Sequence, residues 1–386
     1  MAQVHAPRSV WITGTGAVSC LGQSVGELWQ NLRANKTGIH EGVGRIALDA
    51  TTAGIKTQNR ALQLAQVAIQ EAMKQAGWTK LNADDGIILA TTTGQILLWD
   101  QALVQRTVDP SAADHFRQAF VHQPLGELLR AVQVELNHAG PSSLLTSACS
   151  ASTQALALAA MWIRQARVKR CMVVGVEVLC DLTLEGFRSL QLLSQTSSRP
   201  FDVKRQGINL SEGAAVICLD SDSTNALAEL SGFGMSSDGH HMTGPHPEGE
   251  GSLRAMGDAL KVAGILPADI SWVHAHGTGS KQNDLSEGLA VCRLFGERQP
   301  YISSTKWSHG HALAASGTLE VALVVKALAE QIVLHTRGME VPDPQMPVNH
   351  PLQDRSVSLK HVLKSTLGFG GSNAALVISH VNARAR

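Results

Sequence analysis

One cysteine in this 386-residue chain stands where a reactive nucleophile could form. Cys149 follows the apolar pair Leu144 and Leu145 and precedes a stretch rich in helix formers, so we expect it at a strand-to-helix turn. Free backbone N–H groups and the helix dipole at such a turn favour a thiolate, which attacks ester and thioester carbonyls. The simpler alternative is an ordinary buried cysteine, since free cysteine is often buried.

Two histidine segments in the second part of the chain could complete such a site. His276 follows a short apolar stretch, and Lys306 and His311 precede a helix of small residues. A thiol with two imidazoles suits acyl transfer followed by carbanion chemistry. His274 and His309 alternate with this pair, so a metal site is the competing interpretation. Nearby acidic residues are not spaced as metal ligands, which favours acyl transfer.

Four landmarks recur in the same order and divide the chain into two similar parts. The similar segments pair as follows along the chain: 9–19 with 228–237, 81–94 with 266–279, 144–152 with 301–306, and 171–177 with 365–371. Strands that alternate with helices predict an α/β fold with mixed, mostly parallel sheets. We therefore expect two halves, residues 1–220 with Cys149 and residues 221–386 with His276, Lys306 and His311, joined at a polar turn.

The repeated Gly-x-Gly segments at Gly14 and Gly232 each follow an apolar stretch, and we expect glycine-rich turns there. A dinucleotide site would need a third glycine at the right spacing, which is absent. The repetition itself favours a structural role.

Composition excludes several classes of protein. The chain is 44% hydrophobic with zero formal net charge, which predicts a large core and no global field for nucleic acid or an anionic membrane. A local basic patch for an acidic partner remains compatible with this. No apolar run could span a membrane, and no signal sequence is evident. Six scattered cysteines without a CxxC indicate a reducing compartment, so we expect a cytoplasmic protein.

Several motifs, in order, resemble those of the β-ketoacyl-acyl carrier protein synthases, the condensing enzymes of the thiolase superfamily. They are Thr-Ser-Ala-Cys-Ser-Ala (146–151), Ser-Arg-Pro-Phe-Asp (198–202), His-Ala-His-Gly-Thr-Gly (274–279), Ser-Thr-Lys (304–306), Gly-His (310–311) and Gly-Phe-Gly-Gly-Ser-Asn (368–373). The resemblance covers essentially the whole chain. It implies a thiolase-like duplicated αβαβα fold of five layers.

The resemblance also implies a reaction, a decarboxylative Claisen condensation in fatty acid or specialised polyketide or polyene biosynthesis. Cys149 would carry the acyl chain, with the backbone N–H groups of Cys149 and Phe369 as oxyanion hole. His276 and His311 would stabilise the enolate that malonyl decarboxylation produces. Lys306 and Glu320 would form a supporting ion pair that orients His311. The family implies no organic cofactor and no catalytic metal.

Substrate-binding positions follow from the same resemblance. Thr278 and Ser280 match residues that hydrogen-bond the pantetheine arm. Phe369 matches a gating phenylalanine, and Gly370 would let its loop move. Thr93 stands where a larger aliphatic side chain often limits chain length, which leaves the preferred acyl chain open.

The expected partners are acyl- and malonyl-loaded acyl carrier protein and a second synthase chain, in a homodimer or heterodimer. Residues 97–140 read as an insertion, part of which we expect to contact a partner subunit. A non-catalytic chain-length partner is the main alternative, although such partners lack the nucleophile. A thiolase would need a second cysteine in segment 368–373, and an initiating synthase specific for coenzyme A thioesters would not have His311.

Overall fold

Ten strands form one sheet whose two parts repeat the same strand order. The computed structural model describes residues 8–48, 59–121 and 123–383; residues 1–7, where no signal sequence is expected, lie outside these ranges. The first half supplies β1 (Trp11–Ser19), β3 (Gly86–Ala90), β4 (Ser142–Leu145), β5 (Arg170–Glu177) and β7 (Gly213–Asp220). The second supplies β8 (Ala228–Ser237), β9 (Ile270–His274), β10 (Tyr301–Ser303), β13 (His361–Gly368) and β14 (Ser372–Ser379).

The strand order is β4-β3-β5-β7-β1 followed by β8-β14-β13-β9-β10, so each strand has a counterpart at the same distance from the centre. The two parts join where β1 pairs with β8 over Trp11 and Ile12. The duplication inferred from the sequence is therefore present in the strand topology. The exact boundary at residues 220 and 221 stays a prediction.

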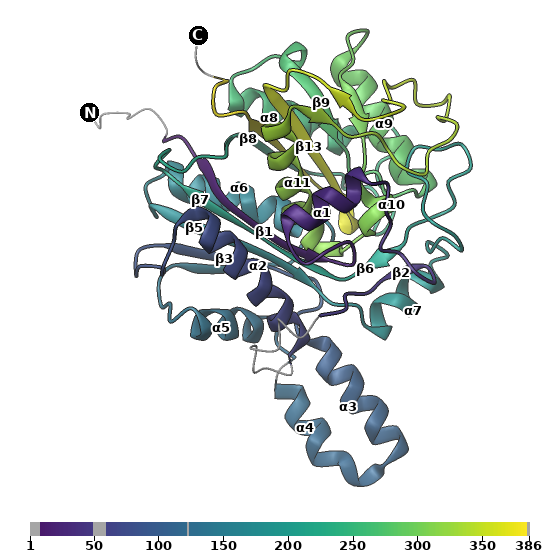
Figure 1. Cartoon of the computed structure of the whole chain (residues 1–386). Helices are drawn as coiled ribbons and strands as arrows, with labels where there is room; N and C mark the ends of the chain where they lie inside the picture. The colour runs from purple at the N-terminus through teal and green to yellow at the C-terminus, as the bar shows by residue number, and fades with distance from the viewer. Residues whose placement is uncertain (1–7, 49–58, 122, 384–386) are drawn as a thin grey trace.

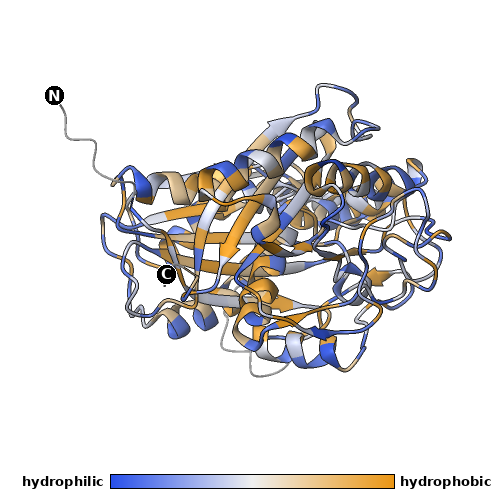
Figure 2. Ribbon diagram, turned by 90° about the horizontal axis from the view of Figure 1, so that it is seen from above, coloured by the Kyte–Doolittle hydropathy of each residue, from blue (hydrophilic) through white to orange (hydrophobic). Residues whose placement is uncertain are grey.

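Helices cover both parts of the sheet and fill the space between them (Figure 1). The helices α6 (Ala151–Arg164) and α11 (Ser316–Glu330) pack against strands of both halves and form the central layer. The outer layers are α2 (Arg60–Ala76) with α5 (Gly126–Glu135) on one side, and α8 (Glu250–Ala263) with α9 (Lys281–Phe295) on the other. This is the five-layer αβαβα arrangement. Figure 2 shows mostly hydrophobic strands inside, and helices with hydrophilic faces toward solvent.

The remaining elements are short or peripheral. They are α1 (Val25–Arg33), α3 (Ile96–Val108), α4 (Ala113–Val121), α7 (Asp181–Ser189), α10 (Lys306–His309), β2 (Val43–Gly44), β6 (Leu210–Ser211), β11 (Ile332–Val333), β12 (Arg355–Ser356), and the 3-10 turns η2 (Pro110–Ala112), η3 (Pro267–Asp269), η4 (Leu313–Ala315) and η5 (Phe369–Gly371).

The sheet is mixed, as predicted, but less parallel than we expected. Parallel pairing joins β3 to β4 and β5, and joins β9 to β10 and β13. All the central pairs, from β5–β7 through β1–β8 to β13–β14, are antiparallel. The reason is that the last strand of each half inserts between the first strand and the parallel set, and runs opposite to both.

The two Gly-x-Gly segments lie inside β1 and β8, so the prediction of glycine-rich turns was wrong. A Cβ on Gly16 would lie 2.0 Å from the carbonyl oxygen of Ala68 in α2. A Cβ on Gly234 would lie 2.1 Å from the carbonyl oxygen of Ala255 in α8. Glycine is needed in both strands because each outer helix rests directly on the strand backbone.

Helices α3 and α4 form a hairpin that extends away from the body of the molecule (Figure 1). Trp99, Phe116 and Phe120 contact one another inside it, with ring centroids 6.1 to 6.5 Å apart. Val104 and Val108 expose 57% and 82% of their surface. Within the described ranges, no helix is long and apolar enough to cross a membrane.

Candidate active site

Cys149 lies in the turn between β4 and α6, where the sequence placed it. Ala148 has a left-handed φ of 45°, so the chain bends sharply just before the cysteine. Ser147 and Ser150 on either side bond the hydroxyl of Ser372, at 2.7 and 3.1 Å. These bonds tie the cysteine turn to the glycine-rich loop of the second half.

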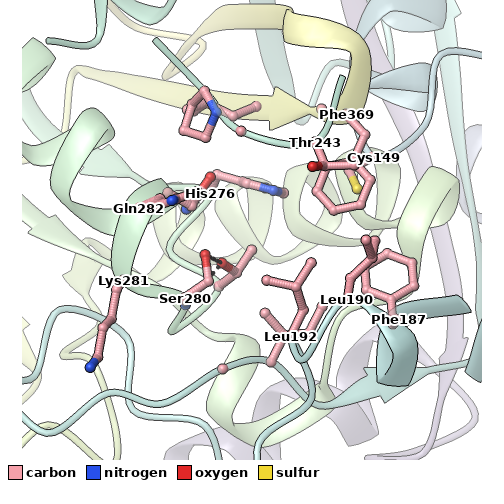
Figure 3. Close-up of a pocket in the computed structure, with 18 of the residues that line it drawn as sticks. Cys149, Phe187, Leu190, Leu192, Thr243, His276, Ser280, Lys281, Gln282 and Phe369 are labelled. Atoms are coloured by element: carbon pink, nitrogen blue, oxygen red, sulfur yellow. Dashed lines mark hydrogen bonds between the residues drawn. The ribbon is translucent and has the colours of Figure 1, made fainter. Parts of the chain in front are cut away.

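Both predicted histidines meet Cys149 although they come from the other half of the chain. The Nε2 atom of His311 lies 3.0 Å from the Sγ atom of Cys149. His276 lies next to His311, with ring centroids 5.1 Å apart and the planes nearly perpendicular. The ligand atoms of all three side chains lie within 4.8 Å of one another. Figure 3 shows the imidazole of His276 directed toward Cys149.

The resting cysteine is a thiol, contrary to the expectation of a thiolate. Burial raises the pKa of Cys149 to about 12. The ammonium group of Lys306, and hydrogen bonds from the backbone N–H groups of Phe369 and Cys149, lower the pKa but do not offset burial. The sequence argument considered only the helix terminus and left out desolvation, since Cys149 is only 4% exposed. Both predicted oxyanion-hole donors nevertheless interact with the sulfur.

The two imidazoles are held neutral. Burial, and then the positive charge of Lys306, lower the pKa of both His276 and His311 well below the usual value. The Nδ1 atom of His311 lies 2.9 Å from the hydroxyl of Ser316 at the start of α11. A hydroxyl both donates and accepts, so Ser316 can serve either tautomer of His311.

A buried charge cluster lies behind the histidines. Lys306 forms an ion pair with Glu320 and donates a hydrogen bond to the carbonyl oxygen of His276 at 2.7 Å. The second carboxylate oxygen of Glu320 pairs with Lys364 at 2.8 Å. Burial alone would raise the pKa of Glu320, but the two ammonium groups hold it well below its usual range. The predicted ion pair is therefore present. It contacts the backbone of His276, whereas Ser316 contacts the ring of His311.

The loop that carries His276 is held by two buried carboxylates of α9. Glu287 accepts hydrogen bonds from the backbone N–H groups of His276 and Gly277, at 2.7 and 2.8 Å. Asp284 accepts bonds from the N–H groups of Thr278 and Gly279. Acidic residues in the first two turns of a helix, directly after a glycine-containing loop, are the sequence signal for this arrangement.

A cavity of about 770 Å³ opens onto Cys149, His276 and His311. Figure 3 shows Ser280, Lys281 and Gln282 among the residues that line it, with the side chain of Lys281 directed away from Cys149. Of the predicted substrate-binding residues, Phe369, Thr278 and Ser280 line it. The described lining includes neither Thr93 nor Gly370.

Thr93 instead faces a buried carboxylate. Its hydroxyl and backbone N–H both donate to Glu177 at the end of β5, at 2.5 and 3.0 Å. Burial raises the pKa of Glu177. The role of Thr93 as a chain-length determinant stays a prediction.

The loop around Phe369 is positioned from several sides. The ring of Phe369 stacks on Phe187 of α7, with centroids 5.3 Å apart and planes at 15°. Gly370 has a positive φ of 79° and donates its N–H to the carbonyl oxygen of Met242 at 2.7 Å. The loop that follows β8 therefore supports the predicted gate. His240 and His241 of that loop also line the cavity.

The four alternating histidines do not form a metal site among the described residues. His274 and His309 are buried and both bond the hydroxyl of Thr305, at 3.2 and 2.8 Å. Within the part of the chain that the structure describes, only Cys149, His276 and His311 are spaced so that they could ligate an ion. Thiolate and imidazole are zinc ligands, so this spacing alone does not separate a metal site from a nucleophile with two imidazoles.

Two family models match most of this chain. Residues 45–225 match the N-terminal domain of β-ketoacyl synthases, and residues 227–340 match the C-terminal domain. The chain belongs to the β-ketoacyl synthase family. It is 31% identical to 3-oxoacyl-[acyl-carrier-protein] synthase 2 of Synechocystis, over 97% of this chain and 99% of that protein.

Solved structures of the family agree with the fold. A chain in the structure of a ketosynthase in complex with its chain length factor, from Xenorhabdus doucetiae, is 28% identical with a TM-score of 0.85, covering 97% of this chain and 98% of that one. A β-ketoacyl synthase from Burkholderia phymatum is 26% identical with a TM-score of 0.88, covering 97% and 100%. The prediction of a thiolase-like condensing enzyme is confirmed.

Sequence reasoning missed two polar side chains of the site, Ser316 and Lys364. Ser316 opens a helix of small residues and has no distinctive spacing. Lys364 lies in an otherwise apolar strand, and a lysine at such a position was the available signal.

Proposed function

We propose that this chain condenses an acyl group held on Cys149 with malonyl-acyl carrier protein, releasing CO₂ and β-ketoacyl-acyl carrier protein. The observation that carries the proposal is the 3.0 Å contact between Cys149 and His311, with His276 beside it, at the end of a large cavity. The pathway is fatty acid or specialised polyketide or polyene biosynthesis. A chain-length partner would have no use for an assembled nucleophile, so the catalytic role is favoured.

In the first step, Cys149 exchanges its proton for the acyl group of a carrier thioester. The thiol is protonated at rest, so a base must act during the attack. Nε2 of His311 is in position to take the proton, while Nδ1–H donates to Ser316. The backbone N–H groups of Cys149 and Phe369 stabilise the oxyanion. The carrier thiolate leaves with the proton from His311.

In the second step, the malonyl thioester loses CO₂ and becomes an enolate. His311 now takes the other neutral tautomer, in which Nδ1 accepts a hydrogen bond from the hydroxyl of Ser316. Its Nε2–H and that of His276 donate hydrogen bonds to the enolate oxygen. Neutral imidazoles suit this role because they stabilise the charge and do not quench the carbanion with a proton. The carbanion attacks the acyl carbonyl, and Cys149 leaves as a thiolate that regains a proton. Lys306 and Glu320 hold the backbone at His276.

The cavity accommodates the substrate arm. Thr278 and Ser280 line it and offer hydroxyl groups to the pantetheine chain. Phe369 separates the carrier side from the acyl side and moves with the flexible backbone at Gly370. From the family resemblance we infer that Thr93, together with a segment of the partner subunit, limits chain length.

The partners we infer are acyl carrier protein and a second synthase chain. A solved ketosynthase with a TM-score of 0.89 is described as bound to an acyl carrier protein. The extended hairpin α3–α4, with its exposed apolar side chains, is the surface we expect the second chain to cover. We expect the enzyme to act in the cytoplasm, where its six free cysteines would stay reduced.

Intact-mass spectrometry with a panel of acyl-carrier-protein thioesters tests the proposal. We expect a mass gain that peptide mapping places on Cys149, loss of the adduct in Cys149→Ala, and an unchanged adduct in the control Cys292→Ala. His276→Ala should still acylate but release little CO₂ from malonyl carrier protein. Acylation that persists in Cys149→Ala would refute the assignment of the nucleophile. No adduct with a folded wild-type protein would favour the chain-length partner.

A further inference from the structure

Lys364 is a fully buried lysine that the reaction described above does not use. It lies on β13, four residues before the Gly-Phe-Gly-Gly loop, with no exposed surface. Its Nζ atom pairs with Glu320 at 2.8 Å and donates to the carbonyl oxygen of Ser365 and, at 2.9 Å, to the hydroxyl of Thr366. Lysine is almost never fully buried unless it is paired, so this position needs an explanation.

The charge of Lys364 exceeds what the ion pair requires. Lys306 and Glu320 already form a neutral pair that contacts the backbone of His276. Lys364 adds a second ammonium group to the same carboxylate, and its positive charge, like that of Lys306, acts on the two imidazoles, while Glu287 is a second carboxylate that acts on Lys364. Burial lowers the pKa of Lys364, and the carboxylate of Glu320 opposes this shift and favours the charged form.

Lys364 also connects structural elements of the site. The hydroxyl of Thr366, which accepts its hydrogen bond, lies 2.9 Å from the hydroxyl of Thr153 in α6. Helix α6 follows Cys149, α11 carries Glu320, and β13 leads to Phe369. The ammonium group therefore lies among the elements that supply the nucleophile, the carboxylate and the oxyanion loop.

We propose that Lys364 is a positioning residue for the decarboxylation step: it anchors the free carboxylate oxygen of Glu320, and its charge keeps His276 and His311 unprotonated. This rests on the enolate-stabilising role proposed above for the two histidines. A protonated imidazole would transfer its proton to the enolate carbanion and end the cycle without forming a carbon–carbon bond. Positive charge close by disfavours that protonation.

Other charged and titratable groups face these imidazoles and share in the effect. They are Lys306, Glu320, His309 and Cys149, while Glu287 contacts the backbone of His276 and His274 lies beside Glu320. Glu320 opposes the lysines, because its negative charge raises the pKa of both imidazoles. Removal of Lys364 takes away one positive charge and leaves the Lys306–Glu320 pair intact.

The test is the pH dependence of CO₂ release from malonyl carrier protein for wild type and Lys364→Met. The active form has neutral imidazoles, so activity falls as pH drops through their pKa. Loss of the ammonium group raises that pKa, and the acid limb should move to higher pH by on the order of one unit. Acylation of Cys149, followed by intact mass, should change less. The matched control is Lys326→Met, an exposed lysine of α11 that pairs with Glu330, and its profile should superimpose on wild type.

An unchanged acid limb with a uniform fall in rate would mean that Lys364 is only structural and would overturn the inference. If Lys364→Met does not fold, Lys364→Gln, which retains a hydrogen-bond donor for Thr366, is measured in the same way. Failure of the underlying function would look different, because wild type itself would then release no CO₂ or acylate a residue other than Cys149.

Discussion

Replacing Glu320 by glutamine should remove the centre of the buried charge cluster while preserving its shape. The carboxylate has no exposed surface, and each of its oxygens faces an ammonium group, of Lys306 and of Lys364. Glutamine has almost the same volume, so packing is retained and only the charge is lost. Both lysines would then face a neutral amide in a region without solvent.

The expected cost follows from the burial. Breaking a buried pair by removing one partner costs about 3–5 kcal/mol, because the remaining charge is left uncompensated. Both lysines keep a polar contact, Lys306 with the carbonyl oxygen of His276 at 2.7 Å and Lys364 with Thr366 at 2.9 Å. We therefore expect Glu320→Gln to lower the free energy of unfolding by about 3 kcal/mol at pH 7, the lower end of that range.

The pH dependence provides a second signature. Burial already lowers the pKa of Lys364, and Glu320 opposes that shift, so with the carboxylate gone the pKa of Lys364 in the folded state falls further below the unfolded value. The unfolded state then binds more protons than the folded state, so stability rises with pH until Lys364 is neutral in both states. The difference in the free energy of unfolding between wild type and Glu320→Gln should therefore shrink between about pH 7 and pH 10. The upper value is near the pKa of an unperturbed lysine.

Urea unfolding at a series of pH values measures both effects. The matched control is Glu330→Gln on the same helix, where Glu330 is 36% exposed and pairs with Lys326 at 3.3 Å. That variant should stay within about 0.5 kcal/mol of wild type at every pH. A loss below about 1 kcal/mol for Glu320→Gln, or a deficit that does not change with pH, would refute the reasoning that the carboxylate compensates two buried charges.

Two further predictions concern the site and the fold. Ser316→Ala removes the hydrogen-bond partner of Nδ1 of His311. Losing about 1 kcal/mol of hydrogen bonding should slow both acyl loading and decarboxylation about fivefold. Stopped-flow measurements of acyl loading and assays of CO₂ release would measure the two rates. Gly16→Ala forces a Cβ to within 2.0 Å of a backbone oxygen and should destabilise by at least about 2 kcal/mol in urea unfolding. The control Gly257→Ala, inside α8 with no atom within 4 Å of the added Cβ, should stabilise by about 0.5–1 kcal/mol. Equal effects of the two alanines would contradict the close helix–strand approach.

Local patterns in the sequence were enough to place the nucleophile. An apolar strand followed by small residues and helix formers located Cys149 at a turn, because that change of periodicity depends on near neighbours alone. The same patterns, repeated in order, predicted two similar halves. The histidine pair could be chosen because duplicated halves bring equivalent strand ends together.

Mixed pairing and the role of the glycines needed the tertiary structure. A buried strand has the same residue pattern in a parallel and in an antiparallel sheet. The sequence therefore led us to expect more parallel pairs of strands than the sheet contains. A Gly-x-Gly segment reads as a turn from its residue types. Only the position of Ala68, more than fifty residues away, shows that Gly16 provides room for a helix backbone.

Residue types and order therefore determined the fold class, the family and the identity of Cys149, His276, His311, Lys306 and Glu320. The tertiary structure decided the charge states: that Cys149 rests as a thiol and that the imidazoles are neutral. It also showed that Ser316 and Lys364 belong to the site. Ionisation depends on burial and on distances between side chains remote in sequence, as between Cys149 and His311, and no local pattern encodes those distances.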